Sequence, residues 1–180
     1  MIDKRNQFEV ELLPHIDAAY NLARWLVRDE HVAEDIVQDA FLRAFQYYGG
    51  FRDGPARPWL LAIVRNVCHN WFAQRKRSLE LVDPDDDPEL KAPFLDDQGI
   101  PGTPETLLAQ TQERAQVNAA MVGLPLVFRE VLVLREMEEM SYEDISRVLQ
   151  IPLGTVMSRL SRARALLRKT LSHFRQAQRP

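Results

Sequence analysis

Two amphipathic helical patterns separated by one short break occupy residues 140–169, and they constrain this chain more than any other feature. Ser141 can cap the first helix, because its hydroxyl can accept a hydrogen bond from a free backbone N–H of the first turn. Apolar side chains then recur at helical spacing, at Tyr142, Ile145, Val148 and Leu149. Ile151-Pro152 ends this pattern, since proline biases the residue before it away from helix, and a second helix can begin at Pro152 or Leu153. The stretch therefore predicts a helix-turn-helix.

The second of these helices has an apolar stripe and separate polar faces. The stripe consists of Val156, Leu160, Ala163 and Leu167. The second helix of a helix-turn-helix enters the DNA major groove, so its outward side chains are candidates for contact with bases and phosphates. We predict that the DNA-binding residues here are Thr155, Ser158, Arg159 and Arg162, with Ser161 at the edge of the same surface.

The charge of the C-terminal end supports this prediction. No Asp or Glu follows Ile145, although the whole chain has a net charge of −3. The same segment holds Arg147, Arg159, Arg162, Arg164, Arg168, Lys169, Arg175 and Arg179. An ordinary solvated helical face is the alternative, but a basic run that follows a turn motif favours phosphate binding.

The overall composition excludes several classes of protein. With 180 residues the chain forms one domain or two small ones, and no apolar run approaches the ~20 residues needed to cross a bilayer. The N-terminus lacks the apolar segment of a signal peptide. Cys68 is the only cysteine, so neither an intrachain disulfide nor a cysteine zinc cluster can form. We expect a cytoplasmic, all-α protein without a cofactor.

Helical periodicity divides the chain into two halves. Helices are expected over residues 5–28 (where Pro14 either starts a new helix or kinks this one), 31–45, 58–77, 104–122 and 126–137. Residues 78–103 are rich in proline and aspartate, which is typical of a stiff acidic linker. We therefore expect two small helical domains, residues 1–77 and 104–180, on either side of this linker.

The loop between the helices at 31–45 and 58–77 combines glycine, aromatic and arginine residues. Tyr47, Tyr48 and Phe51 either stack on unpaired bases, together with Arg52, or close the top of a small core. Both alternatives remain open, and different rings can do different jobs.

The helix at 58–77 has a polar face opposite its apolar stripe. Asn66 can read base edges, and the terminal cluster can neutralise phosphates. The candidate DNA-contacting residues on this helix are Arg65, Asn66, His69, Arg75, Lys76 and Arg77. Cys68 and His69 diverge by about 100° around the helix, so they cannot form a nucleophile–base pair. His31 and Asp35 are spaced like a metal pair, but no further ligands accompany them and no metal site is expected.

Taken together, these stretches resemble the second and fourth regions of extracytoplasmic-function sigma factors of bacterial RNA polymerase. The resemblance rests on AEDIVQDAF, then PW and RN in the next helix, and GTV, SRL and RAR in the helix-turn-helix. It covers nearly all of residues 5–77 and 104–170. An ordinary helix-turn-helix regulator that binds duplex DNA is the alternative, but it has no need of residues 31–77.

The resemblance implies a non-enzymatic protein that gives promoter choice and strand opening to core RNA polymerase. The expected partners are the β′ coiled coil and the β flap of the polymerase, promoter DNA and an anti-sigma factor. The helix at 31–45 would dock on the coiled coil through Glu34, Asp35, Gln38, Asp39 and Arg43. The loop and the helix at 58–77 would meet the minus-ten element, and residues 155–162 would read the minus-thirty-five element.

The sequence departs from the family's usual pattern at several positions. Gln150 stands where the turn usually has glycine, at a cost of about 1 kcal/mol if its φ is positive. In the family a basic residue is common where this chain has Met157, and His or another polar residue where it has Ser161. Both positions can face DNA, so the recognised DNA sequence is expected to differ from that of better-known members. In the free protein, we expect the two basic faces either to pack together or to be covered by an inhibitor. We also expect the acidic linker to lie in the nucleic-acid channel of the polymerase.

Overall fold

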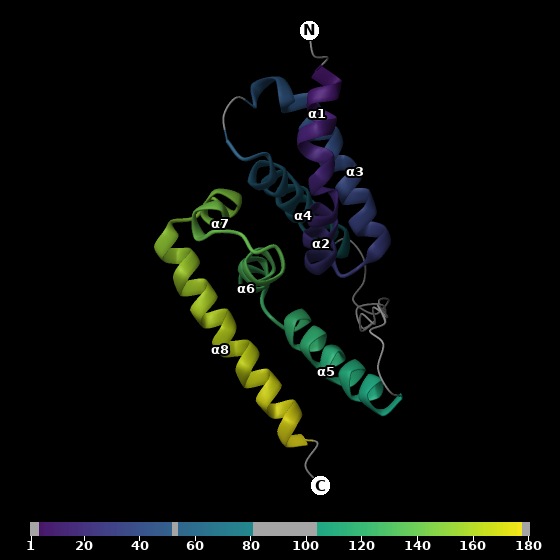
Figure 1. Cartoon of the computed structure of the whole chain (residues 1–180), viewed down its shortest axis with the longest axis vertical. Helices are drawn as coiled ribbons and strands as arrows, with labels where there is room; N and C mark the ends of the chain where they lie inside the picture. The colour runs from purple at the N-terminus through teal and green to yellow at the C-terminus, as the bar shows by residue number, and fades with distance from the viewer. Residues whose placement is uncertain (1–3, 52–53, 81–103, 178–180) are drawn as a thin grey trace.

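The computed structural model describes residues 4–51, 54–80 and 104–177, and every regular element in those ranges is helical (Figure 1). The helices form two groups, one on each side of residues 81–103. Most of the predicted acidic linker lies outside the described residues. The predicted all-α fold with two helical regions is confirmed.

The first group contains α1 (Lys4–Leu12), α2 (Ile16–Val27), α3 (Glu30–Tyr47) and α4 (Ala56–Glu80), with short 3-10 turns at Leu13–His15 and Tyr48–Gly50. Pro14 lies in the first of these turns, so the helix predicted over residues 5–28 is divided there. Asp29 caps α3, because its Oδ1 accepts a hydrogen bond from Val32 N at 2.9 Å.

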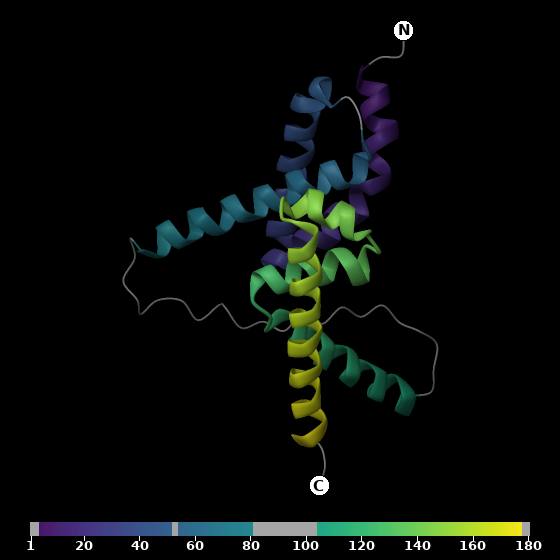
Figure 2. The same ribbon diagram turned by 90° about the vertical axis from the view of Figure 1, so that its left-hand side faces the viewer.

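Helix α4 is longer than the sequence predicted. Pro58 was expected at its first position, but α4 begins at Ala56, and it continues past Arg77 to Glu80. Proline is tolerated anywhere in a first helical turn, where the backbone N–H groups have no partner within the helix, so Pro58 marked the turn and not its first residue. Figure 2 shows the C-terminal half of α4 projecting away from the other helices.

The second group contains α5 (Pro104–Val122), α6 (Leu126–Leu132), a π-helical turn (Val133–Met137), α7 (Tyr142–Leu149) and α8 (Leu153–Ala177). The expected cap of α7 is present, since Ser141 Oγ accepts a hydrogen bond from Asp144 N at 3.1 Å. Gln150 ends α7 with a φ of 54°, which confirms that the turn requires the left-handed conformation.

The two groups share one continuous core. Leu26 and Leu60 of the first group belong to the same cluster of buried side chains as Val131 and Ile145 of the second. The main contacts between the groups join α4 to α7 and α2 to α6. In Figure 2, α7 accordingly lies beside the N-terminal half of α4.

Two side chains lie where the sequence pattern did not place them. Helical periodicity predicts that Phe45 lies on the apolar stripe of the helix at 31–45, but it is 42% exposed near the end of α3. The same pattern predicts that Arg129 lies on the polar side of the helix at 126–137, but it is buried. The pattern was wrong for Arg129 because the side of α6 that carries it faces the C-terminal ends of α2 and α5, where backbone carbonyl groups accept its hydrogen bonds.

Candidate nucleic-acid interface

The N-terminal half of α8 presents a polar surface to solvent. Val156, Leu160 and Ala163 are buried against the second helical group, which fixes the rotation of α8. That rotation leaves Ser158, Ser161 and Arg162 exposed, while Thr155 and Arg159 are half-buried at the edge. Ser158 Oγ donates a hydrogen bond to Thr155 O at 3.1 Å. The structure therefore brings the predicted residues of this helix together on one surface.

Apolar side chains interrupt this polar surface. Leu153 is 37% exposed and Met157 is 48% exposed, one helical turn apart at the start of α8. Apolar side chains in a major groove contact the methyl group of thymine. Arg164, in contrast, forms an exposed ion pair, with its Nη2 2.7 Å from Glu136 Oε1.

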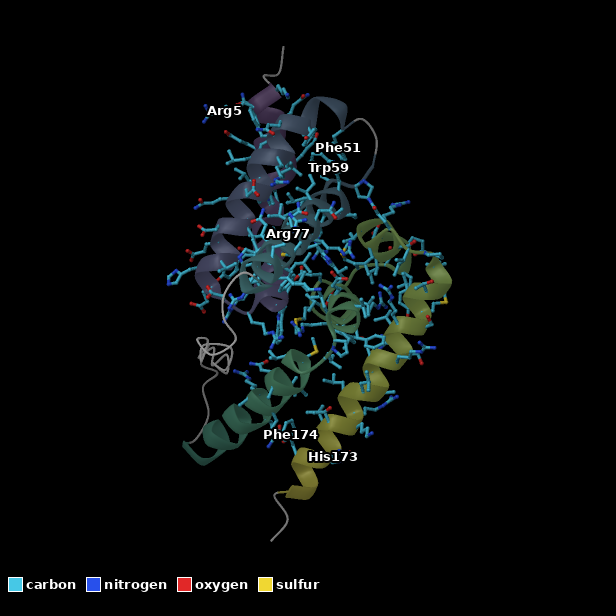
Figure 3. All side chains as sticks on the ribbon, turned by 180° about the vertical axis from the view of Figure 1, so that it is seen from behind. Arg5, Phe51, Trp59, Arg77, His173 and Phe174 are labelled. Carbon is cyan, nitrogen blue, oxygen red and sulfur yellow. The ribbon has the colours of Figure 1, made fainter. Side chains whose placement is uncertain are left out.

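The aromatic residues of the loop before α4 divide into two classes. Tyr48 is buried, and its ring packs edge-on against Phe8 with the centroids 5.4 Å apart. Burial and a hydrogen bond with Glu11 raise the pKa of the Tyr48 phenol. Phe51 packs on Trp59 at a centroid distance of 4.6 Å, and the labelled side chains lie together in Figure 3. Tyr48 and Phe51 thus close a small core, whereas Tyr47 is 67% exposed; Arg52 lies outside the described residues.

On α4, two of the predicted DNA-contacting side chains are engaged by the second helical group. Arg65 Nε donates to Glu130 Oε1 at 3.1 Å, and its Nη2 lies 3.4 Å from Glu130 Oε2. His69 Nε2 lies 2.5 Å from the same Glu130 Oε1. Asn66, on the neighbouring face, is exposed. The middle of α4 therefore carries both a covered and an open surface.

The basic C-terminal end of α4 lies beyond these contacts. The guanidinium of Arg75 is 5.4 Å from the centroid of the Trp71 ring, in a cation–π arrangement. Lys76 and Arg77 are exposed, on the part of α4 that projects in Figure 2. This cluster stays accessible to phosphates while the two helical groups are packed together.

Sequence analysis missed the acidic residues that contact α4. Glu130 and Glu138 are both buried, at 0% and 5% exposure. Glu138 accepts hydrogen bonds from Arg57 Nη2 at 2.5 Å and from Asn21 Nδ2 at 3.2 Å. A signal was present, because Arg129-Glu130 lies within an otherwise apolar run, and charged residues within such a run are buried only when paired.

A second polar surface lies on α3. Glu34, Asp35, Gln38 and Arg43 are exposed there, and Asp39 is half-buried. Arg43 Nε donates to Asp39 Oδ1 at 3.0 Å. Leu42, beside them, is 65% exposed. The five predicted docking residues therefore share one accessible helical face.

The described residues offer little support for chemistry of other kinds. Cys68 is fully buried, and burial, with a contribution from the Glu130 charge, raises the pKa of its thiol to about 12. A thiol in that state is not a nucleophile at neutral pH. Within the described ranges, no group of three or more potential metal ligands comes together, and no helix is long and apolar enough to cross a membrane.

Comparison with known families matches both helical groups separately. Residues 13–78 match the family model of sigma-70 region 2, and residues 114–167 match that of sigma-70 region 4. The RNA polymerase sigma-H factor of Pseudomonas aeruginosa is 35% identical over 174 residues, which is 94% of this chain and 88% of that protein. The chain is an extracytoplasmic-function sigma factor of bacterial RNA polymerase. As a sigma factor it is a non-enzymatic initiation factor that binds RNA polymerase and promoter DNA.

Other relatives agree with this assignment. The ECF RNA polymerase sigma-E factor of Escherichia coli is 32% identical over 72% of this sigma factor and 69% of its own length. The solved structure of the sigma factor RpoE in complex with the anti-sigma factor NepR from Bartonella quintana superposes with a TM-score of 0.75. It has 26% identity and covers 92% of this chain and 97% of that one. Matches to both regions in one chain disfavour the stand-alone regulator as an alternative.

Proposed function

We propose that α8 reads the minus-thirty-five element through Thr155, Ser158, Arg159 and Arg162. The observation that carries this proposal is the orientation of α8, whose apolar stripe is buried while its polar side is open to solvent. Leu153 and Met157 lie at the same end of the helix and are placed to meet thymine methyl groups. Residues 104–180 form the domain that performs this step and that meets the β flap of the polymerase.

We propose further that residues 1–77 form the domain that meets the minus-ten element, with residues 78–103 as the connection. Tyr47, which is exposed in the loop, is the ring best placed to stack on an unpaired base. Asn66, Lys76 and Arg77 on α4 are exposed as well, and we assign them to the same DNA-binding surface. Tyr48 is buried and Phe51 is partly buried, so these two rings are assigned a structural role beneath the base-binding surface.

The exposed face of α3 supports docking on the β′ coiled coil of core polymerase. Glu34, Asp35 and Gln38 offer carboxylate and amide groups beside the exposed Leu42, a combination suited to a basic, partly apolar helix. The Arg43–Asp39 pair at 3.0 Å holds this surface in one arrangement. Removing the Asp39 carboxylate is expected to weaken polymerase binding and to leave DNA binding by the free protein unchanged.

An anti-sigma factor is a further proposed partner. Two similar solved structures are complexes by their titles, one of RpoE with the anti-sigma factor NepR and the other of CnrH with the cytosolic domain of CnrY. CnrH superposes with a TM-score of 0.65 at 25% identity and covers 96% of this chain and 91% of that one. Because the similarity to these two proteins extends over nearly the whole chain, it supports an inhibitor that binds both helical groups.

A run-off transcription assay tests the proposal directly. The reaction contains this protein, bacterial core RNA polymerase and a promoter library read by sequencing. Initiation at a shared pair of elements is expected. Asp39→Asn should abolish initiation by loss of polymerase binding, while Asp17→Asn, an exposed position on α2 away from the proposed surface, should not. Normal initiation by Asp39→Asn would refute the docking assignment.

A further inference from the structure

The contact between the two helical groups contains every charged residue that is buried in the described part of the chain. These residues are Arg129, Glu130 and Glu138, at 3%, 0% and 5% exposure. All three come from one segment, α6 and the turn that follows it. Each of them bonds to the first helical group: Glu130 and Glu138 to α4 and Arg129 to α2. The burial of charge is therefore a property of this interface and not of either group alone.

The ion pairs of this interface are in register. Arg57 of α4 meets Glu138, and Arg65 of α4 meets Glu130, so the same number of residues separates the two members on each side. The order is reversed between the two segments, which makes the pairing antiparallel. Residues with this separation on a helix lie about 12 Å apart, so the two glutamates hold α4 at two points.

The π-helical turn helps both glutamates to face α4. In an uninterrupted α-helix, positions 130 and 138 would differ by about 80° in direction. The wide turn at Val133–Met137, which closes with the Glu138 N–H donating to Val133 O, takes up an additional residue and removes most of that offset. Glu139 then leaves the turn with a φ of 50°, a conformation uncommon outside glycine. The backbone thus departs from regular helix where it aims Glu138 at Arg57.

The ion pairs make this interface specific in geometry, but they add little net free energy to the association that the shared apolar core provides. Burying carboxylates and guanidinium groups costs desolvation energy that approximately offsets their attraction, whereas apolar side chains of the same volume would bind without that cost. When the groups separate, water and phosphates can solvate or pair the same charges. The pairs therefore favour one closed arrangement while leaving the two groups able to part.

We propose that Glu130 and Glu138 form an intramolecular latch that occupies anion-binding positions of α4 in the free protein. In this closed form, Arg57, Arg65 and His69 are held by carboxylates where DNA phosphates would otherwise bind. The reading surface of α8 stays open at Ser158, Ser161 and Arg162. Polymerase opens the latch when it separates the two groups on its own surface. This inference rests on the proposed role of α4 at the minus-ten element.

The latch also differs from a packing of two basic faces, which was one of the arrangements expected from the sequence. The basic side of α4 meets the acidic side of α6 and its following turn, and the basic side of α8 takes no part in the ion pairs that join the groups. A chain whose C-terminal end is strongly basic thus keeps a few acidic residues at the positions that face α4.

The test compares the full-length wild-type chain with the double variant Glu130→Gln/Glu138→Gln. Both changes keep side-chain shape and remove charge. Binding of a fluorescent single-stranded DNA of random sequence is measured by anisotropy, with random duplex as the reference. We expect the double variant to bind the single strand about tenfold more tightly and the duplex almost unchanged. With core polymerase present, the wild type and the variant should bind the single strand alike.

The separation of the two helical groups is measured by electron spin resonance, as the distance between spin labels attached to cysteines introduced by Val10→Cys and Ser172→Cys. Both positions are exposed, on α1 and α8. Every labelled chain also carries Cys68→Ala, because the double variant removes the Glu130 charge that helps to raise the pKa of this buried thiol. The distance distribution of the double variant should broaden towards longer values. Glu143→Gln, an exposed substitution on α7 that removes one carboxylate charge as Glu138→Gln alone does, is the matched control and should alter neither measurement.

Three results would overturn the latch. A wild-type distance distribution together with wild-type DNA binding overturns the latch. If the two groups separate but the single strand is not bound more tightly, the latch does not cover a DNA-binding surface and the proposal is overturned. That result also shows that the assignment of α4 to melted DNA has failed. An equal gain for duplex and single strand shows a general charge effect and likewise overturns the proposal. Glu138→Gln alone, whose partner Arg57 is partly exposed, keeps the test valid if the double variant folds poorly.

Discussion

Helices α4 and α8 have the same length, 25 residues, and both carry basic side chains proposed to meet DNA, yet they differ in how available those side chains are. On α8 the polar surface is open, with Ser158 and Arg162 exposed. On α4, Arg65 is bonded to a buried carboxylate from the other helical group. Both helices are basic, so the difference in availability arises from what packs against each one.

The comparison shows that one fold can expose one proposed DNA-binding surface, on α8, while it covers part of the other, on α4. An initiation factor gains from such an order of events. Duplex DNA at the minus-thirty-five element is present before melting, whereas single-stranded DNA at the minus-ten element appears only once polymerase is engaged. A free protein with both surfaces open would also bind nucleic acid without polymerase, since phosphate contacts carry most nonspecific affinity.

The largest effect is expected from the residue that ties the two groups together. Arg129 donates hydrogen bonds to Val122 O and Leu124 O at 2.8 Å in its own group, and to Trp25 O and Leu26 O at 3.3 Å in the other. Burial lowers its pKa to about 10, so it remains a cation at neutral pH. Arg129→Met should reduce the free energy of unfolding by about 3 kcal/mol, because it leaves several buried carbonyls without a donor.

Urea unfolding of the full chain, followed by circular dichroism, measures this loss. Arg147→Met is the control, since the Arg147 side chain is 62% exposed and its pair with Asp144 should contribute less than about 1 kcal/mol. Equal stabilities of the two variants would show that α2 and α6 are not coupled through Arg129. The availability of α4 would then need another explanation.

The next prediction separates α8 from α4 in function. Arg162→Ala should weaken duplex binding by the free protein about tenfold, because an exposed guanidinium on the reading surface is lost. Asn66→Ala removes an exposed side chain from α4 without touching the latch, so its effect should appear only with polymerase and forked promoter DNA. Anisotropy with and without core polymerase measures both. If Asn66→Ala weakened binding by the free protein as much as Arg162→Ala, the two surfaces would be equally available.

Much of this fold follows from local patterns in the sequence. Ser141, the Ile151-Pro152 break and the stripe from Val156 to Ala163 were sufficient to predict the helix-turn-helix, because caps, breaks and periodicity act within a few residues of chain. Gln150 in the left-handed turn follows from the same local geometry. The placement of exposed residues on α3 and α8 also agrees with the predicted apolar stripes.

The interface between the groups did not follow from the sequence, for a physical reason. Periodicity reveals which face of a helix is buried, but not which distant element covers it. Arg129 was placed on a polar face because a cation usually is, and only the convergence of two helix C-termini, with their unpaired carbonyls, makes its burial possible. Glu130 and Glu138 are likewise understood only once α4 lies opposite them.

The smallest predicted effect asks whether the two groups unfold together. Gln150 ends α7 and Arg28 ends α2, both in the left-handed conformation with φ of 54° and 62°. Glycine adopts this conformation without strain, so Gln150→Gly and Arg28→Gly should each stabilise the protein by about 0.5–1 kcal/mol, less whatever entropy glycine adds to the unfolded chain. Gln150→Ala, which keeps the strain, is the control.

Calorimetry shows how that gain is distributed between the two groups. If the buried ion pairs couple the groups, both glycine variants should raise a single unfolding transition. If the groups are independent, each variant should raise only the transition of its own half. When Gln150→Gly or Arg28→Gly is introduced into the variant Glu130→Gln/Glu138→Gln, each glycine should raise only the transition of its own group. The reason is that the contacts that couple α4 to α6 have been weakened. A single transition that persists in that background would mean that the shared apolar core, including Leu60 and Ile145, joins the groups without help from the charges.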